Sequence, residues 1–210
     1  MKDNIKKLTL LMIITVIATF ILAATVMADP PRYLRGQYVG TGGGSSFVAF
    51  CGFTSSTNLV PNYVSLGVTY LLQTYSQKTV TTYNPDGTGS QTGTKHVITF
   101  NPSPSFEYPW AGEQSFSSRF TYVIGPDGTI TITTVPNTYT FTWTSGPDVG
   151  YTNTVYQITT VGYVSKDGKT IISDTGEPPV ATFGTPISPC GPFQLFGTFS
   201  GVSIKQDEDD

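Results

Sequence analysis

The sequence predicts an all-β protein, and three features lead to this prediction: composition, alternation and repeated turns. After residue 28 the chain is rich in Thr, Ser, Gly and aromatic residues, whereas the helix-forming residues Leu, Ala, Glu and Lys are scarce. Threonine and aromatic side chains suit the pleated surface of a sheet. No segment after residue 28 carries apolar residues at the spacing of a helix.

Alternation of apolar and hydroxyl side chains is clearest between residues 115 and 145. In 138–145, Tyr139, Phe141 and Trp143 alternate with four threonines, and 115–124 alternates aromatic with polar residues. Side chains two positions apart lie on one face of a strand, so each segment has one apolar and one polar face. This pattern is typical of an antiparallel sheet that is packed on one side only.

Asp-Gly pairs at 86–87, 127–128 and 167–168 each separate two strand-like segments. Asp-Gly favours a hairpin because glycine adopts positive φ and aspartate tolerates it. The nearly equal spacing would also suit a repeat, but the flanking residues do not align, and a hairpin meander is the simpler explanation.

The expected strands should form an antiparallel meander that closes into a barrel of about eight strands, because closure removes the sheet edges. A two-sheet β-sandwich is the alternative. Some of the segments should merge, and they lie at 36–41, 46–53, 63–75, 77–83, 88–100, 115–124, 129–135, 138–145, 151–164, 169–173 and 193–204.

Three segments are expected to lie between strands. The Gly-rich segment 41–46 should be a hairpin tip or bulge. The Pro-rich segments 101–112 and 177–192 should be loops, because proline cannot donate to a ladder. The first of these loops carries Phe106, Tyr108 and Trp110, which would either form a lid over a cavity or pack on the barrel end.

The first 28 residues have the pattern of a secretory signal peptide. Lysines precede an apolar run over 8–27, and Val26-Met27-Ala28 provides small residues for cleavage. An uncleaved membrane anchor is the alternative, since the run is long enough to cross a bilayer. Cleavage would leave a β-barrel domain at 29–205, exported to the periplasm or the medium, without stable membrane insertion.

Charge argues against nucleic acid as a partner. The signal carries three lysines and one aspartate, and its removal leaves 8 basic and 13 acidic residues, a net charge of −5. Such a chain repels phosphate backbones and has no basic stripe. Several of the acids lie in the tail 206–210, which is expected to be solvated.

Cys51 and Cys190 are the two cysteines of the chain. In an oxidising compartment they are expected to form a disulfide between the first and last parts of the barrel; two buried thiols are the alternative. A structural metal site would need four ligands, and His96 is the one histidine. We therefore expect no metal, no cofactor and no catalytic residue.

The apolar face suggests a binding role. Tyr38, Tyr122, Tyr139, Phe141 and Trp143 are predicted to line a cavity for a small hydrophobic ligand. A core filled by side chains is the alternative, and it would favour a structural or surface-interaction protein. A cavity of several hundred cubic ångströms would distinguish the two.

Two short motifs carry a resemblance to known proteins. Arg35-Gly36-Gln37-Tyr38-Val39-Gly40 and Ser165-Lys166-Asp167-Gly168-Lys169-Thr170 are similar to segments of small secreted bacterial β-barrel proteins of unassigned function, whose barrels resemble lipocalins, of the calycin group. Gly36-Gln37-Tyr38 stands where lipocalins carry Gly-x-Trp, although Tyr replaces Trp and neither a Thr-Asp-Tyr motif nor a terminal-strand arginine is present. The resemblance implies a barrel that binds a small apolar molecule. A looser resemblance to allene oxide cyclase barrels would imply an isomerase.

Overall fold

The computed structural model describes residues 33–49, 53, 70–100, 109–175, 180–182 and 194–207. The predicted signal peptide, Cys51, Cys190, Phe106 and Tyr108 lie outside these residues. The described residues contain no helix that is long and apolar enough to cross a membrane.

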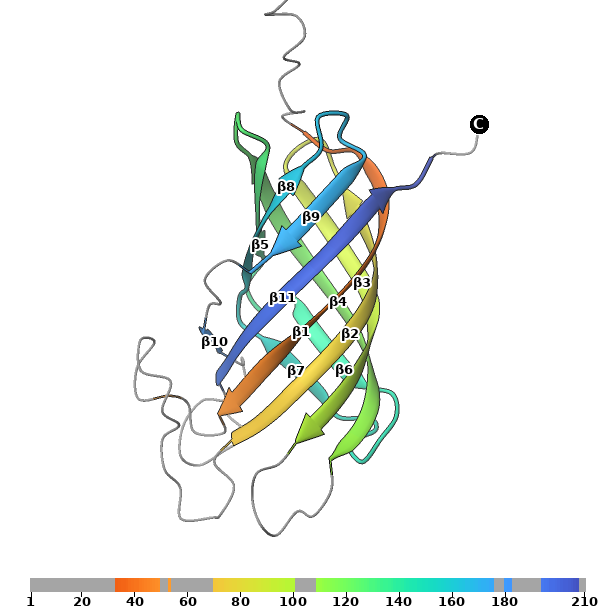
Figure 1. The fold of residues 1–210 in the computed structure, drawn as a ribbon, viewed down its shortest axis with the longest axis vertical. Coiled ribbons are helices and arrows are strands. Elements are labelled where there is room, and N and C mark those ends of the chain that lie inside the picture. The colour runs from red at the N-terminus through yellow and green to blue at the C-terminus, as the bar shows by residue number, and fades with distance from the viewer. Residues whose placement is uncertain are drawn as a thin grey trace, which may run out of the picture.

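Every described element is a β-strand, and all the strands belong to one antiparallel sheet (Figure 1). The strands are β1 (Gly36–Ala49), β2 (Tyr70–Tyr83), β3 (Thr88–Phe100), β4 (Trp110–Ile124), β5 (Thr129–Thr134), β6 (Tyr139–Trp143), β7 (Thr152–Val155), β8 (Thr159–Val164), β9 (Thr170–Asp174), β10 (Val180–Thr182) and β11 (Gln194–Lys205).

Eight of these strands form a closed ring in the order β3-β2-β1-β11-β9-β8-β5-β4, and β4 pairs back with β3. The first and last described strands, β1 and β11, are partners, from Tyr38 opposite Lys205 to Ala49 opposite Gln194. The predicted antiparallel meander with about eight strands is thereby confirmed. Several expected segments merge, since 36–41 joins 46–49 and 70–75 joins 77–83.

At three positions of the ring, two short strands take the place of one long strand. These pairs are β5 with β6, β8 with β7, and β9 with β10. β5 and β6 both pair with β4, but five residues separate Thr134 from Thr140 where only two separate Ser117 from Phe120. The connecting residues include Pro136, which cannot donate to a ladder. The Arg119 N–H donates to the Thr138 hydroxyl at 3.2 Å, and the Arg119 carbonyl accepts from the Val135 N–H at 2.8 Å, so residues of the connection pair with β4 at the interruption.

The ring is closed in one half of the barrel only. β8 pairs with β9 in this half. In the other half, among the described pairings, β7 pairs with β6 alone and β10 pairs with β11 alone. The wall is therefore not even around its axis. The expected single strand at 151–164 is divided into β7 and β8 at this place.

The Gly-rich segment lies in the middle of β1, so the predicted hairpin tip is wrong. A Cβ on Gly42 would come within 2.6 Å of the Phe199 ring, and a Cβ on Gly44 within 2.9 Å of the Tyr75 hydroxyl. The missing side chains let these large neighbours lie against the wall. Glycine here provides close approach, not a turn.

The two ends of the barrel differ because a meander sends alternate connections to alternate ends. The three Asp-Gly turns, at 84–87, 125–128 and 165–168, lie at one end, which we call the turn end. The connections at the opposite end are longer, and we call it the loop end; the β6–β7 connection at 144–151 belongs to it (Figure 1). Glycines 87, 128 and 168 all have positive φ, as the predicted turns require.

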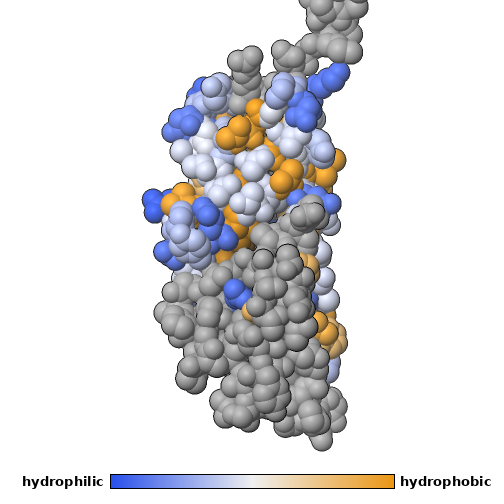
Figure 2. Space-filling view, turned by 90° about the vertical axis from the view of Figure 1, so that its left-hand side faces the viewer, coloured by the Kyte–Doolittle hydropathy of each residue, from blue (hydrophilic) through white to orange (hydrophobic). Residues whose placement is uncertain are grey.

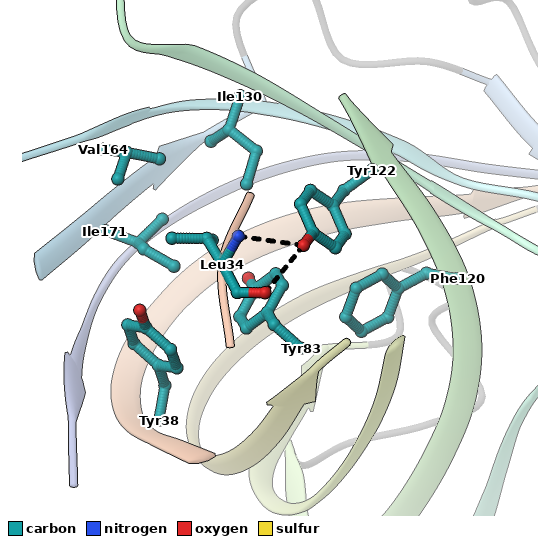
Figure 3. Packing of buried hydrophobic residues seen from close by; sticks show 8 residues of the cluster. All are labelled: Leu34, Tyr38, Tyr83, Phe120, Tyr122, Ile130, Val164 and Ile171. Carbon is teal, nitrogen blue, oxygen red and sulfur yellow. Dashed lines mark hydrogen bonds between the residues drawn. The ribbon is translucent and has the colours of Figure 1, made fainter. Parts of the chain in front are cut away.

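Side chains fill the barrel at its turn end (Figure 3). Tyr83 is central, and its ring lies edge-on to the rings of Tyr38, Phe120 and Tyr122 at centroid distances of 5.2, 5.3 and 5.1 Å. Aromatic pairs favour this geometry. The buried cluster, which we call the turn-end core, comprises Leu34, Tyr38, Tyr83, Phe120, Tyr122, Ile130, Val164 and Ile171.

Hydrogen bonds between tyrosine hydroxyls and backbone groups hold the segment before β1 and two of the turns at this end. The Tyr122 hydroxyl accepts from the Leu34 N–H at 3.0 Å and lies 2.9 and 2.7 Å from the carbonyl oxygens of Leu34 and Asn84, its two available acceptors. The Tyr38 hydroxyl donates to the Gly168 carbonyl at 2.5 Å. Burial raises the pKa of Tyr38 to about 12, so this hydroxyl keeps its proton at neutral pH.

The outer face carries mainly hydroxyl side chains, with apolar residues between them; Figure 2 shows one side of it. Val39 of β1 lies opposite Val80 of β2 and Ile204 of β11, and Ile172 of β9 lies opposite Val202 of β11. Such cross-strand pairs stabilise a sheet locally.

Adjacent isoleucines on β9 test which face of the strand is the interior. Ile171 is 1% exposed and Ile172 is 58% exposed. We expect Ile171→Ala to lower the free energy of unfolding by about 2–5 kcal/mol, because it leaves a cavity in the turn-end core. Ile172→Ala should change it by less than about 0.5 kcal/mol. Denaturant unfolding measures both, and equal losses for the two variants would contradict the assigned faces.

Candidate functional site

An internal cavity of about 500 Å³ occupies the barrel between the turn-end core and the loop end. Tyr83 and Phe120 of the turn-end core bound it on one side, and Trp110 and Trp143 line it toward the loop end. Its size lies within the range of small-molecule sites.

The strands bring polar residues into this cavity as well as aromatic ones. Lys95 of β3 lies opposite Gln77 of β2 and opposite Gln114 of β4, and all three line the cavity. Gln73 donates to the Thr99 hydroxyl at 3.1 Å and accepts from Ser46 at 3.4 Å. The interior is therefore amphipathic.

Lys95 is the most unusual residue of this site. Its ammonium lies 4.9, 5.1 and 5.2 Å from the ring centres of Tyr75, Phe116 and Tyr139, so three rings surround it. It also donates a hydrogen bond of 2.5 Å to the Tyr139 hydroxyl. Aromatic faces attract a cation, and more strongly where water is excluded.

A glycine on the same strand makes room for one of these rings. Gly93 lies opposite Phe116, and a Cβ on Gly93 would approach the ring to 2.6 Å. The missing side chain lets Phe116 lie flat against β3, next to Lys95. The aromatic surroundings of the ammonium thus depend on the cross-strand register of β3 and β4.

Burial acts against the charge of Lys95. It lowers the pKa of the ammonium, and Tyr75 opposes this shift. Burial raises the pKa values of Tyr75 and Tyr139, so both phenols remain neutral where Lys95 is charged. The ion pair found among the described residues joins Lys169 to Asp207, and none reaches Lys95. Asp148, a carboxylate on the cavity lining, is exposed.

The predicted ligand-binding residues divide into two groups. Tyr139, Phe141 and Trp143 of β6 line the cavity, as does Trp110, whose ring centre lies 4.9 Å from that of Trp143. Tyr38 and Tyr122 belong to the turn-end core instead. Alternation identifies the inward face of a strand, but it does not say at which level of the barrel a residue lies. A role of these residues in binding stays a prediction.

Of the other residues considered in the sequence analysis, the structure describes Trp110 and His96. Trp110 begins β4, so the expected loop at 101–112 ends earlier than predicted, and Trp110 contributes to the cavity wall. His96 is exposed and lies opposite Glu113 on the outer face of the sheet. It does not line the cavity.

Sequence reasoning did not find Lys95. The available signal was its position two residues before Val97 and four before Thr99, both of which are buried. Once the inward face of 88–100 is assigned from Val97, alternation places Lys95 inside. The face was difficult to assign because threonine, glycine and glutamine occupy most of this strand.

Fold and cavity together define this chain as an antiparallel β-barrel with an amphipathic interior that contains one lysine among its described lining residues. No family model matches the sequence, and no curated protein is significantly similar to it.

Replacing the buried ammonium by an apolar group should stabilise the empty barrel. We expect Lys95→Met to raise the free energy of unfolding at pH 7 by about 1 kcal/mol or more, or about 2–4 °C in thermal midpoint. Lys95 has a lowered pKa when folded and the ordinary value of 10.5 when unfolded. Its charge therefore opposes folding at neutral pH, and this penalty disappears as the pH rises from the folded pKa toward 10.5.

The measurement is thermal unfolding of wild type and Lys95→Met between pH 6 and 10.5. The difference in thermal midpoint between Lys95→Met and wild type should become smaller at high pH. Lys78→Met, on the exposed side of β2, is the matched control and should leave the midpoint unchanged. A variant several degrees less stable than wild type at pH 7 would show that Lys95 is a structural residue.

Proposed function

We propose that this barrel binds a small, largely apolar molecule in its interior. The observation that carries the proposal is the cavity of about 500 Å³ whose aromatic lining includes both tryptophans of the chain. Binding sites for small molecules are commonly apolar concavities with a few polar groups, and this lining has that character.

The two alternative functions have less support. A structural protein with a filled core fits the turn end but not the cavity beyond it. His96, a candidate proton-transfer group for an isomerase of the allene oxide cyclase type, lies on the outer face and does not line the cavity. The lipocalin resemblance supports the binding proposal through layout, since both are antiparallel barrels.

Export belongs to the same proposal. Residues 1–28 would direct the chain out of the cytoplasm, and a disulfide between Cys51 and Cys190 would form there. Pairing in the sheet supports such a link, because Ala49, two residues before Cys51, lies opposite Gln194, four residues after Cys190. A ligand-binding barrel in the periplasm or the medium would capture or carry its ligand there.

Tryptophan emission provides a direct test. We expect N-phenylnaphthylamine, a neutral apolar fluorophore, to bind with a stoichiometry of one and to quench Trp110 and Trp143 by energy transfer, since both line the cavity. Thr160→Phe, which places a ring in the cavity from β8, should weaken binding at least tenfold. Thr159→Phe is the matched control, because Thr159 is exposed on the same strand.

Equal binding by the two variants would place the fluorophore on the outer surface. No binding by wild type at micromolar concentrations of the fluorophore would contradict an apolar binding cavity.

A further inference from the structure

The charge on Lys95 lacks a counter-ion within the described part of the chain. No described carboxylate lies within 4 Å of its ammonium, and the rings and phenol that surround it are neutral. A buried charge is costly unless it is paired. If residue 95 served only to fill space, an uncharged side chain of similar length would stabilise the fold better. The charge of Lys95 therefore needs an explanation.

The Tyr139 hydroxyl takes up only one of the hydrogen-bond donors of the Lys95 ammonium. A lysine ammonium has three N–H donors, and one of them is directed to the Tyr139 hydroxyl. Gln77 and Gln114 flank Lys95 on the neighbouring strands, and both line the cavity with it. Their amides provide two further N–H donors each on either side of the ammonium.

We propose that the ligand of this barrel carries a single carboxylate, which pairs with Lys95, while its apolar part lies among the aromatic residues of the cavity. The inference rests on the proposed binding function and specifies the substrate class. One carboxylate accepts up to four hydrogen bonds, which matches an ammonium flanked by two amides.

The number of cations limits the charge of the ligand. Lys95 is the one Lys or Arg residue among the described residues that line the cavity. A phosphate monoester carries close to two negative charges at neutral pH, and one lysine would leave part of that charge buried and unpaired. A monoanion is balanced completely.

The direction of the ligand follows from the two ends of the barrel. The turn-end core bounds the cavity on one side, whereas Trp110 and Trp143 line it toward the loop end. Between Lys95 and the turn-end core the lining includes the polar residues Thr79, Gln91 and Ser118, so with the carboxylate at Lys95 the apolar chain extends toward the tryptophans. Tryptophan emission then reports on the apolar part, and Lys95 variants report on the carboxylate.

A pair of probes with the same chain separates the two contributions. Decanoate and decanol differ only in the head group, and each can be titrated by displacement of N-phenylnaphthylamine. We expect wild type to bind decanoate about 10- to 100-fold more tightly than decanol, as a charge-assisted hydrogen bond predicts. Lys95→Met should bind decanol about as wild type does and decanoate no more tightly than decanol, because its carboxylate would be left unpaired. Lys78→Met should behave as wild type.

The pH profile provides a second readout. Decanoate affinity should fall as the pH rises through the pKa of Lys95, whereas decanol affinity should stay constant. Tyr75 and Tyr139 face Lys95, and their raised pKa values keep them neutral through this window. Asp148 also lines the cavity, and its side chain is exposed.

The outcomes separate the two proposals. Equal affinity of wild type for decanoate and decanol would overturn the carboxylate inference and leave the apolar binding function standing. Binding of neither probe would overturn the binding function itself. A decanoate preference that survives in Lys95→Met would assign the anion to another cation and also overturn the inference.

Discussion

Antiparallel pairing between β1 and β11 is the constraint on which the rest of the structure depends. These are the first and last strands of the barrel, and they are hydrogen-bonded in continuous register from Tyr38–Lys205 to Ala49–Gln194. This pairing turns a sheet with two edges into a ring with an inside and an outside. Once the ring is closed, every second side chain has to fill, or border, a common interior.

The interior is divided because connections of different length close its two ends. Tight Asp-Gly turns bring the strands together at the turn end, where the segment containing Leu34 and the aromatic rings around Tyr83 fill the space. The Tyr122 hydroxyl accepts from the Leu34 N–H, so this buried backbone donor of the segment has a partner. The cavity begins where this packing stops, and the missing side chain of Gly93 makes room for the Phe116 ring on its lining.

Lys95 places a positive charge where burial opposes it. Three aromatic rings and a phenol stabilise its ammonium, yet burial still lowers its pKa. Residues that oppose folding are common where a site is organised for a ligand. An anionic partner would remove this opposition by supplying the missing charge, whereas a structural residue would have no reason to keep it.

The sequence by itself determined the all-β class, the antiparallel meander, the Asp-Gly turns and the inward direction of Tyr139, Phe141 and Trp143. These features depend on local rules: a two-residue period, and the ability of glycine to adopt positive φ. Only the tertiary structure decided that the Gly-rich segment 41–46 is strand, because Tyr75 and Phe199 approach it from elsewhere in the chain. It also decided that Tyr38 and Tyr122 pack in the core while Tyr139 borders a cavity with Lys95. The level of a residue along the barrel is set by register between strands, and register depends on pairing over long separations that a local pattern does not contain.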